Sequence, residues 1–362
     1  MKYDYLIVGS GLFGSVFARL ATDAGKSCLI IEKRSHIGGN CYTENVRGIN
    51  VHKYGAHIFH TNDEDVWRFV HRFAQFNNYV NSPKAIAKGK MYSLPFNMNT
   101  FYELWGVHRP GEATRIIETQ RFLGTPTNME EQALSIVGVD LYELLVKEYT
   151  EKQWGRSPRD LPPLIIKRLP LRFTFDNNYF TDRYQGIPIG GYTKMFEGML
   201  QGIEVRLAAD YLADREYFHS LAHNVVYTGC LDELFDYEFG DLDYRSLEFD
   251  HKVHEVDNWQ GNAVVNYCDA SVPYTRVIEH KHFEMLTTPH TVVTHEYSRD
   301  HKRGMVPYYP INDAGNQARY SKYCEKAKSL PHLILGGRLA EYRYMDMEAV
   351  IRSAIDAFGG RV

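Results

Sequence analysis

The 362-residue sequence lacks several features that would assign it to a class at once. Its five cysteines are odd in number and form no C-x-x-C pair, which favours reduced thiols over a disulfide framework. Its sixteen histidines show no H-E-x-x-H or comparable ligand spacing, so we predict no metal site. No apolar run reaches about 18 residues, so no membrane-spanning helix is expected.

The sequence also lacks an excess of charge of either sign. Lysine and arginine total 41 against 45 aspartate and glutamate residues, which leaves a net charge of −4. Without an overall basic field, nucleic acid is not an expected partner. The first residues, "MKYDYLIVG", enter a predicted strand without the apolar core and cleavage site of a secretory signal. We therefore expect a cytoplasmic protein.

Among the features that are present, the clearest is a glycine-rich turn near the N-terminus. Its glycines follow the spacing G-x-G-x-x-G and are Gly9, Gly11 and Gly14. The turn lies between an apolar strand over 4–8 and a helix expected over 12–24, and a second strand over 27–31 ends at Glu32. This order predicts a Rossmann-type unit, in which the helix N-terminus receives a pyrophosphate and the acid receives a ribose hydroxyl.

Two further glycine pairs indicate which dinucleotide is bound. The stretch "EKRSHIGGN" (32–40) places a Gly-Gly pair shortly after the acid, and "LILGGR" (333–338) repeats such a pair before a C-terminal helix. Both motifs resemble those of FAD enzymes of the glutathione-reductase and amine-oxidase type. A simple NAD-dependent dehydrogenase does not need the second pair, so we predict FAD as the cofactor.

The remaining periodicity predicts an α/β fold in which the nucleotide-binding unit is interrupted. Helical periodicity covers 63–77 and 98–150, whereas short alternating runs over 242–300 predict an antiparallel sheet. Apolar strands return at 203–207, 224–229 and 332–337, and a helix is expected over 346–358. We predict a discontinuous Rossmann-like FAD-binding domain (1–80, 203–241 and 318–362), a helical subdomain (81–150), and an antiparallel sheet and substrate subdomain (151–202 and 242–317) with a mobile loop near 160–175.

Arginines, tyrosines and a tryptophan recur in the inserted segments and near the C-terminus. Guanidinium groups and phenols suit a diphosphate, and an aromatic ring can stack on a nucleobase. Composition cannot show that the segments converge, so each residue taken singly is equally well explained as a solvated charge or a core edge. The group comprises Tyr149, Trp154, Arg168, Arg172, Tyr179, Arg276, Tyr308, Tyr309, Arg338, Tyr342, Arg343, Tyr344 and Asp346.

Taken together, the motifs resemble those of the bacterial UDP-galactopyranose mutases over essentially the whole chain. The motifs are "GSGLFG", "EKRSHIGGN", "YGAHIFHT", "YTEKQWG", "IIKRLPLRFTFDNNYF", "YQGIPIGGYTKMFEGML", "VPYYP" and "GGRLAEYRYMDM". The resemblance implies interconversion of UDP-galactopyranose and UDP-galactofuranose without net redox, with N5 of reduced FAD as the covalent nucleophile at the anomeric carbon. It also implies an external flavin reductant, a homodimer, and a product used for cell-surface polysaccharide.

The resemblance further implies roles for individual residues. Arg168 matches a mobile-loop arginine that closes over the UDP diphosphate, and Arg276 matches the second arginine of that clamp. Other substrate-binding positions are Asn81, Tyr149, Trp154, Tyr179, Tyr309 and Tyr344. Cofactor-binding positions are Gly9, Gly11, Phe13, Gly14, Glu32, Lys33, Gly39, Asn40, His57, His60, Arg338, Tyr344, Asp346 and Met347. We expect Arg168→Ala or Arg276→Ala to cost about 2–4 kcal/mol of transition-state stabilisation and to leave the fold nearly unaffected.

Two other functions remain open from the residues alone. An FAD amine oxidase or related dehydrogenase would share the cofactor motifs but not the group of arginines and tyrosines. A protein that only senses flavin or binds a nucleotide sugar would bind UDP without forming an isomer.

Overall fold

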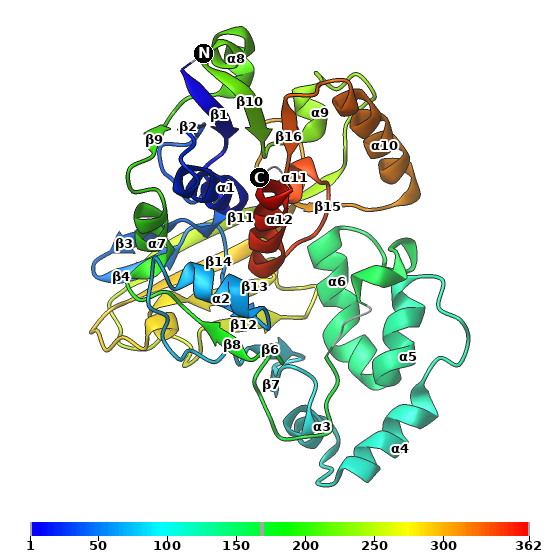
Figure 1. Ribbon diagram of the computed structural model, residues 1–362. Helices are drawn as coiled ribbons and strands as arrows, with labels where there is room; N and C mark the ends of the chain where they lie inside the picture. The colour runs from blue at the N-terminus through cyan, green and yellow to red at the C-terminus, as the bar shows by residue number, and fades with distance from the viewer. Residues whose placement is uncertain (1, 167–169, 361–362) are drawn as a thin grey trace.

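The computed structural model describes residues 2–166 and 170–360, which form two main sheets and a helical subdomain (Figure 1). In the first sheet every pairing is parallel. The glycine-rich turn follows its central strand, as a Rossmann-type unit requires. In order across the sheet, the strands are β16 (Leu333–Leu335), β10 (Ala222–Tyr227), β1 (Tyr3–Val8), β2 (Cys28–Ile31) and β9 (Glu204–Arg206).

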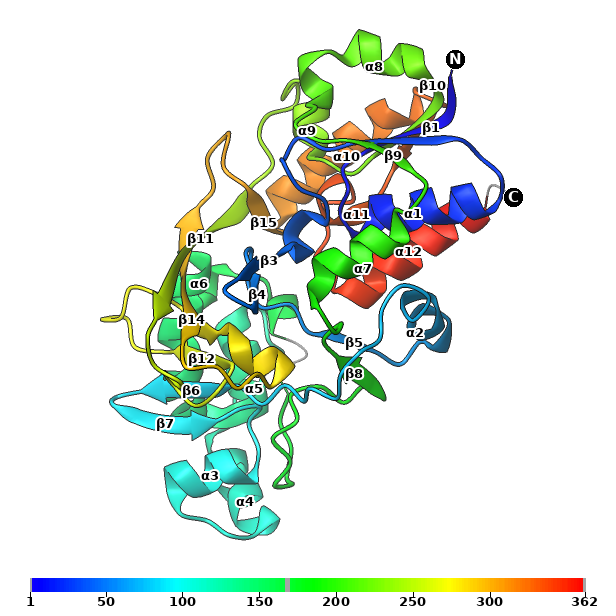
Figure 2. The same cartoon turned by 90° about the vertical axis from the view of Figure 1, so that its left-hand side faces the viewer.

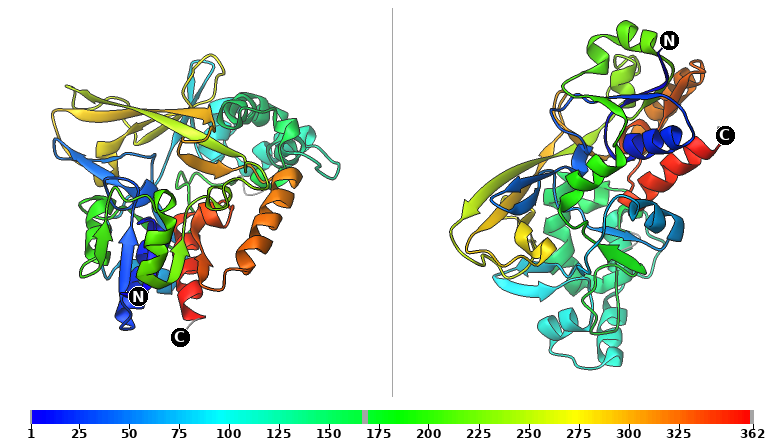
Figure 3. Two further views of the ribbon diagram at one scale, coloured as in Figure 1. Left: turned by 90° about the horizontal axis from the view of Figure 1, so that it is seen from above. Right: turned by 60° about the vertical axis from the view of Figure 1, so that its left-hand side comes forward.

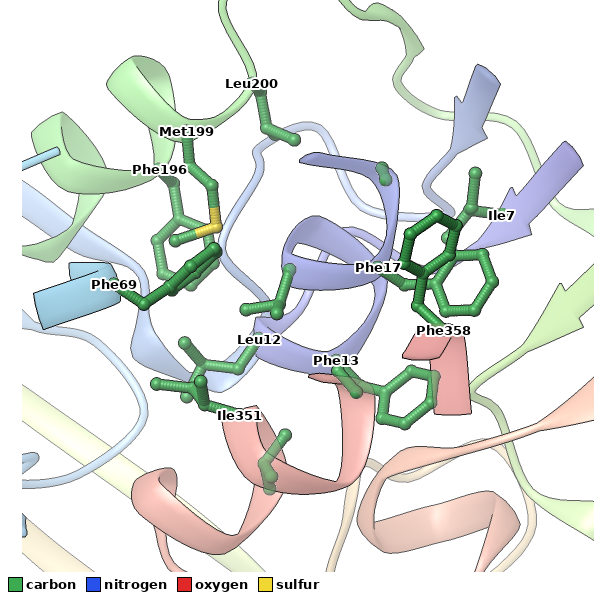
Figure 4. Close-up of a cluster of buried hydrophobic side chains, with 14 of the residues drawn as sticks. Ile7, Leu12, Phe13, Phe17, Phe69, Phe196, Met199, Leu200, Ile351 and Phe358 are labelled. Atoms are coloured by element: carbon green, nitrogen blue, oxygen red, sulfur yellow. The ribbon is translucent and has the colours of Figure 1, made fainter. Parts of the chain in front are cut away.

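Helices cover both faces of this sheet. On one face, aromatic and aliphatic side chains of α1 pack against α12 and α7 (Figure 4). The ring of Phe17 meets Phe358 edge-on, with centroids 5.5 Å apart. These helices are α1 (Leu12–Asp23), α2 (Glu64–Val70), α7 (Gly191–Met199) and α12 (Met347–Gly359). A second buried cluster involves α8 (Arg215–Leu221), α9 (Leu231–Leu234), α10 (Ala314–Lys328) and α11 (Gly337–Ala340).

The second sheet has seven strands and is mixed rather than purely antiparallel. Its pairings are antiparallel except that β12 runs parallel to β6. Residues 84–93 form strands β6 and β7, so the prediction that 81–150 is helical is wrong for that stretch. In order, the strands are β15 (Pro307–Pro310), β11 (Tyr244–His254), β14 (Thr291–Asp300), β13 (Arg276–Glu279), β12 (Val264–Tyr267), β6 (Lys84–Ala87) and β7 (Lys90–Ser93).

The helical subdomain packs at one end of this sheet (Figure 3). Helix α5 is kinked at Gly138, which adopts φ 76°, and a π-helical turn follows it directly. The last helix, α6, lies against the sheet through β14. The elements are α3 (Met98–Trp105), α4 (Pro110–Gln120), α5 (Met129–Leu141), the π-helix η2 (Tyr142–Val146) and α6 (Lys147–Trp154), followed by the 3-10 turns η3 (Pro158–Asp160) and η4 (Pro163–Ile165).

Two predicted boundaries differ from the structure because backbone pairing overrides local periodicity. The helix expected over 63–77 ends at Val70, since the backbone of 75–77 bonds instead to Ile187 and Ile189. Residues 184–202, which we assigned to the sheet subdomain, pack on the nucleotide-binding unit. Strand β8 (Tyr184–Gly186) pairs with β5 (Phe59–Thr61), and α7 contacts α1.

Short elements connect the nucleotide-binding unit to the seven-stranded sheet (Figure 2). The antiparallel pair β3 and β4 contacts β14 and a 3-10 turn, η6. At this junction His52 and His280 are 2% and 1% exposed. These elements are β3 (Thr43–Val46), β4 (Ile49–His52) and η6 (His280–Glu284); the 3-10 turns η1 (Gly39–Cys41) and η5 (Tyr211–Ala213) lie elsewhere.

Within the described part of the chain, no helix is long and apolar enough to cross a membrane.

The close approach of α1 to β1 gives the first prediction. A Cβ on Gly14 would lie 2.1 Å from the carbonyl oxygen of Gly9 and 2.9 Å from Ile7 Cγ2. We expect Gly14→Ala to destabilise the fold by about 3 kcal/mol or more, the upper range for overpacking. Gly111→Ala is the control, because a Cβ there meets nothing within 4 Å and α4 gains up to about 1 kcal/mol of helix propensity. Thermal melts of both variants test this, and equal melting temperatures would contradict it.

The buried histidines give a second prediction. Burial lowers the pKa of His52 to about 3 and that of His280 well below its ordinary value. Below pH 6.5 the unfolded chain therefore binds more protons than the folded one. The free energy of unfolding consequently decreases as the pH is lowered. Each histidine contributes up to about 1.4 kcal/mol per pH unit. Denaturant unfolding between pH 7 and 5 measures the slope. His52→Gln should lower this slope by the equivalent of up to one proton, about 1.4 kcal/mol per pH unit. An unchanged slope in that variant would contradict the lowered pKa of His52.

Candidate functional site

A cavity of about 1000 Å³ opens where the nucleotide-binding unit, the seven-stranded sheet and the helical subdomain meet. Its walls come from the β1–α1 turn, the 38–41 turn, the 54–60 segment, α6, the sheet and the residues after β16. These segments are far apart in the sequence. Their convergence is what composition alone could not show.

At the nucleotide end, two glycine turns face each other. A Cβ on Gly39 would lie 2.9 Å from the Cα of Gly11, so the turn at Gly39 leaves no room for a side chain toward Gly11. Helix α1 begins at this point with no capping side chain and no acidic residue in its first turn. Its first N–H groups therefore remain available at the cavity wall. An uncapped helix N-terminus beside side-chain-free backbone fits the pyrophosphate of a dinucleotide.

The acid after β2 is fixed beside this turn. Glu32 is 6% exposed, and its Oε2 accepts hydrogen bonds from the Ser10 N–H (2.9 Å) and hydroxyl (2.8 Å). The Arg34 N–H donates to the other oxygen at 2.9 Å. The Arg34 guanidinium lies over the ring of Tyr54 at 4.3 Å and donates to Asn40 Oδ1. Sequence analysis did not select Arg34 or Tyr54, although Arg34 stands within the "EKRSHIGGN" motif.

At the opposite end, an ion pair crosses neighbouring strands, with the Arg276 side chain 22% exposed and that of Glu296 3% exposed. Arg276 on β13 stands directly opposite Glu296 on β14, with Nε 2.9 Å from Oε1. Burial alone would lower the pKa of Arg276, but Glu296 and nearby phenols raise it above its ordinary value. Burial raises the pKa of Glu296, and Arg276 opposes that rise. The wall thus carries a permanent guanidinium charge. Glu296 was missed from the sequence, where its only signal is an acid within an apolar strand.

Tyrosines surround this guanidinium. Burial raises the pKa of Tyr149 to about 12 and raises that of Tyr309 and Tyr179 as well, so all three phenols stay protonated at neutral pH. The rings of Tyr309 and Tyr344 have centroids 6.0 Å apart, and Trp154 lies 6.3 Å from Tyr309. Protonated phenols beside an arginine form a set of hydrogen-bond donors suited to a phosphate group.

Helix α6 holds Tyr149 and Trp154 against the sheet by polar contacts. The Lys152 ammonium donates to the carbonyls of Tyr267 (2.5 Å), Val272 (3.0 Å) and Tyr274 (3.1 Å). At the end of the helix, the Gln153 carbonyl accepts from Arg245 Nε and from the Ser298 hydroxyl. The strands around Arg276 and the helix with Tyr149 therefore form one rigid wall.

The middle of the cavity has its own ordered polar side chains. His60 Nδ1 lies 2.6 Å from Asp182 Oδ2, and its ring stacks on Phe180 with centroids 3.7 Å apart. Asn81 is 7% exposed, and its side-chain oxygen lies 3.5 Å from the Tyr79 hydroxyl. Asp182 was not selected from the sequence, because nothing in the local pattern shows that it meets His60.

The residues after β16 complete the cofactor end. Gly336 packs under Phe13, where a Cβ would lie 1.9 Å from the ring, and the Gly337 N–H donates to Glu341 at 3.2 Å. Asp346 caps α12 by accepting from the Ala349 N–H at 2.9 Å. Tyr344 is 65% exposed at the cavity rim.

With one exception, the predicted site residues border this cavity. The exception is Arg168, which lies outside the described residues. Of the wider group of arginines and tyrosines, Arg172 and Tyr342 have structural roles instead. Arg172 donates to the Tyr179 carbonyl at 2.9 Å, and the Tyr342 hydroxyl donates to Asp243 O at 2.6 Å. The residues that border the cavity are Gly9, Gly11, Phe13, Gly14, Glu32, Lys33, Gly39, Asn40, His57, His60, Asn81, Tyr149, Trp154, Tyr179, Arg276, Tyr309, Arg338, Tyr344, Asp346 and Met347.

Across residues 2–166 and 170–360, no group of three or more histidine, cysteine, aspartate or glutamate side chains is placed to hold a metal ion.

Comparison with solved structures supports the observed fold. A structure of reduced UDP-galactopyranose mutase superposes with a TM-score of 0.77, at 13% identity, over 100% of this chain and 94% of that one. Putrescine oxidase bound to putrescine gives a TM-score of 0.58, at 13% identity, over 100% and 99% of the two chains.

Comparison of the sequence with known proteins identifies the family. A model of an NAD(P)-binding Rossmann-like domain matches residues 7–73, and the UDP-galactopyranose mutase model matches 144–344. The dTDP-fucopyranose mutase of Escherichia coli is 42% identical over 97% of this chain and 96% of its own length. A probable UDP-galactopyranose mutase of Klebsiella pneumoniae is 41% identical over 97% and 93%, and the UDP-galactopyranose mutase of Mycoplasma genitalium is 35% identical over 98% and 93%. The chain therefore belongs to the UDP-galactopyranose mutase family of isomerases.

Proposed function

We propose that the protein interconverts UDP-galactopyranose and UDP-galactofuranose, with reduced FAD as its bound cofactor. One observation carries the proposal: the uncapped N-terminus of α1 and Arg276, with its ring of phenols, border the same cavity. The first feature suits a dinucleotide and the second suits the diphosphate of a nucleotide sugar. Membership of the mutase family supports their combined use for isomerisation without net redox.

The residues at the nucleotide end fit FAD. The pyrophosphate would lie against Gly11, Gly39 and the first N–H groups of α1, and Glu32 would accept a ribose hydroxyl. Arg338 and Met347 would border the flavin, as predicted from the C-terminal motif. When bound and reduced, the cofactor supplies N5 as a nucleophile toward the anomeric carbon of the sugar. This explains why the site needs no serine or cysteine nucleophile.

The chain's own contribution is to hold the departing UDP. Arg276 and the phenols of Tyr179, Tyr309 and Tyr344 would donate hydrogen bonds to the diphosphate, whose negative charge grows as the glycosidic bond breaks. Because burial keeps the phenols of Tyr179 and Tyr309 protonated, they remain donors throughout. The fixed wall keeps UDP beside the sugar, so that it can return to either ring form.

The other residues of the wall orient the ends of the substrate. Tyr149 would stack on the nucleobase, with Trp154 beside it, and Asn81 and His60 would lie near the sugar and the flavin. Arg168 remains the predicted mobile-loop arginine of the diphosphate clamp, with Arg276 as its second arginine. An external flavin reductant, a homodimer, a cytoplasmic location and the use of the product in cell-surface polysaccharide belong to the same proposal.

A second candidate is interconversion of the two ring forms of dTDP-fucose. The observation that favours it is the 42% identity to the dTDP-fucopyranose mutase over nearly the whole of both chains. The two substrates share a nucleoside diphosphate and differ in the base, the ribose 2′-hydroxyl and the sugar C6. Comparing kcat/KM for the two furanose substrates separates the candidates.

The first functional prediction concerns the reaction itself. Purified protein is incubated with UDP-galactofuranose, with and without dithionite, and the isomers are separated by chromatography. We expect rapid conversion to the pyranose form only when the flavin is reduced. Conversion by the oxidised protein would contradict the cofactor role. Tight UDP binding without conversion would indicate a binding protein, and anaerobic bleaching by an amine or alcohol would indicate an oxidase.

The ion pair of Arg276 and Glu296 gives the second functional prediction and corrects an earlier expectation. Arg276→Ala should lower kcat/KM about 30- to 900-fold, equivalent to about 2–4 kcal/mol of transition-state stabilisation. It should also destabilise the fold by about 3–5 kcal/mol, because the Glu296 carboxylate is left buried without its partner. The expectation that the fold is nearly unaffected therefore no longer holds for this variant.

The double variant Arg276→Ala/Glu296→Gln separates the two effects. Replacing the carboxylate by an amide removes the unpaired charge, so we expect much of the stability to return while turnover stays low. Melting temperature and kcat/KM of the dithionite-reduced proteins are measured side by side. Turnover of Arg276→Ala within about twofold of the parent, or recovery of turnover in the double variant, would refute the role of Arg276.

A further inference from the structure

His57, on the cavity wall, is held at three of its polar atoms. Its backbone N–H donates to Nδ1 of His52 at 3.1 Å. Its carbonyl oxygen accepts from the Tyr192 hydroxyl at 3.1 Å. Its ring Nδ1 lies 2.8 Å from the carbonyl oxygen of Gly55. These contacts come from β4, α7 and the preceding turn, so the backbone and the ring of His57 are both fixed.

The contact with Gly55 determines which ring nitrogen carries the proton. A carbonyl oxygen can only accept, so Nδ1 of His57 must be the donor. Burial lowers the pKa of His57 to about 4, and the charges of Arg338 and Arg276 oppose its protonation further. At neutral pH the ring is therefore uncharged, and Nε2 carries a lone pair and no hydrogen. Among the described residues no group donates a hydrogen bond to Nε2, so this nitrogen can accept one from a bound molecule.

A second layer holds His52 in the state that this arrangement needs. To accept from His57, Nδ1 of His52 must be unprotonated. The backbone N–H of His52 donates in turn to Nδ1 of His280 at 3.2 Å, so the hydrogen of His280 is on Nε2, which lies 2.6 Å from Thr294 Oγ1. The ring of His52 also stacks on Phe283, with centroids 4.6 Å apart. Protonating Nδ1 of His52 or of His280 would break a contact in this series, and burial disfavours a charge on His57, so the arrangement favours three neutral imidazoles.

The position of His57 suggests what its free nitrogen meets. His57 borders the cavity and is within electrostatic reach of both Arg338, at the proposed cofactor end, and Arg276, at the proposed diphosphate end. Reduction of a flavin adds two electrons from a reductant and protons from solvent to ring nitrogens. The reduced ring therefore carries N–H donors that the oxidised ring lacks. A fixed group that can only accept favours the reduced ring over the oxidised one.

We infer that His52 and Tyr192 are positioning residues that hold His57 with an acceptor nitrogen toward the flavin and thereby favour its reduced state. The inference rests on the proposed function, because it requires a flavin in the cavity. It extends that function to residues that no cofactor or substrate touches directly. It also explains why neutral histidines lie beside a cavity whose wall carries the arginines Arg276 and Arg338.

The test is the midpoint potential of the flavin in the purified holoprotein, measured by dithionite titration against a reference dye. Tyr192→Phe removes the hydroxyl that holds the His57 carbonyl and leaves the ring. His52→Phe removes the acceptor for the His57 N–H and keeps an aromatic ring against Phe283. We expect each variant to shift the reduction equilibrium about tenfold toward the oxidised flavin, which is about 30 mV for a two-electron couple.

Two further variants separate positioning from loss of stability. Tyr323→Phe deletes a buried phenol that donates to the Gly240 carbonyl at 2.7 Å and does not border the cavity. It should lower the melting temperature as Tyr192→Phe does and leave the potential unchanged. His52→Gln supplies an amide oxygen that can accept from His57, so it should restore the potential toward that of the parent.

A direct measurement of the tautomer accompanies the potentials. Imidazole ¹⁵N shifts of the histidine-labelled protein, with the His57 signals assigned through His57→Gln, should show a protonated Nδ1 and a bare Nε2. A protonated Nε2 would overturn the inference. So would parental potentials in both Tyr192→Phe and His52→Phe, or an equal shift in Tyr323→Phe. Absence of isomerisation would refute only the proposed function, because the potentials require bound flavin and no sugar substrate.

Discussion

The site depends above all on an ion pair between two neighbouring strands, whose carboxylate is buried. Arg276 and Glu296 face each other across β13 and β14, and the carboxylate allows a guanidinium to remain charged in a wall otherwise made of aromatic rings. Without Glu296, the cost of burying the guanidinium would be uncompensated. Phenols gather around a charge that cannot be lost, and burial keeps the phenols of Tyr149, Tyr179 and Tyr309 protonated. This end of the cavity thus presents a guanidinium and protonated phenols, which can donate hydrogen bonds to an incoming phosphate.

The same carboxylate connects the two ends of the cavity. A Cβ on Gly55 would lie 3.5 Å from Glu296 Oε2, so the turn that carries His57 packs against the ion pair. On the other side, Lys152 and Arg245 fasten α6 to the strands around the pair. The donors proposed for a diphosphate and the acceptor proposed for a flavin are therefore parts of one rigid framework. Preorganisation of this kind is what electrostatic stabilisation of a leaving group requires.

Local sequence patterns were sufficient for the nucleotide-binding unit because its signals are short-range. A turn that requires glycine, a helix without a cap and an acid at a strand end fall within a few tens of residues, and each has a steric or electrostatic cause. Residues that border the cavity could also be selected from the sequence, but through motifs shared with a known family. Periodicity failed at 75–77, where backbone bonds to a distant segment decided the outcome, and the subdomain boundary failed at 84–93, where β6 pairs with β12.

By itself, the sequence determined the Rossmann-type turn, the glycine pairs that indicate a flavin, and the family. Only the tertiary structure decided which charges meet. Nothing local shows that Glu296 neutralises Arg276, that Asp182 meets His60, or that His52 and Tyr192 fix His57, because these partners are between 5 and 135 residues apart. Whether a polar residue is a solvated surface group or part of a site depends on burial and on its partner. Both are properties of the folded chain rather than of any segment of it.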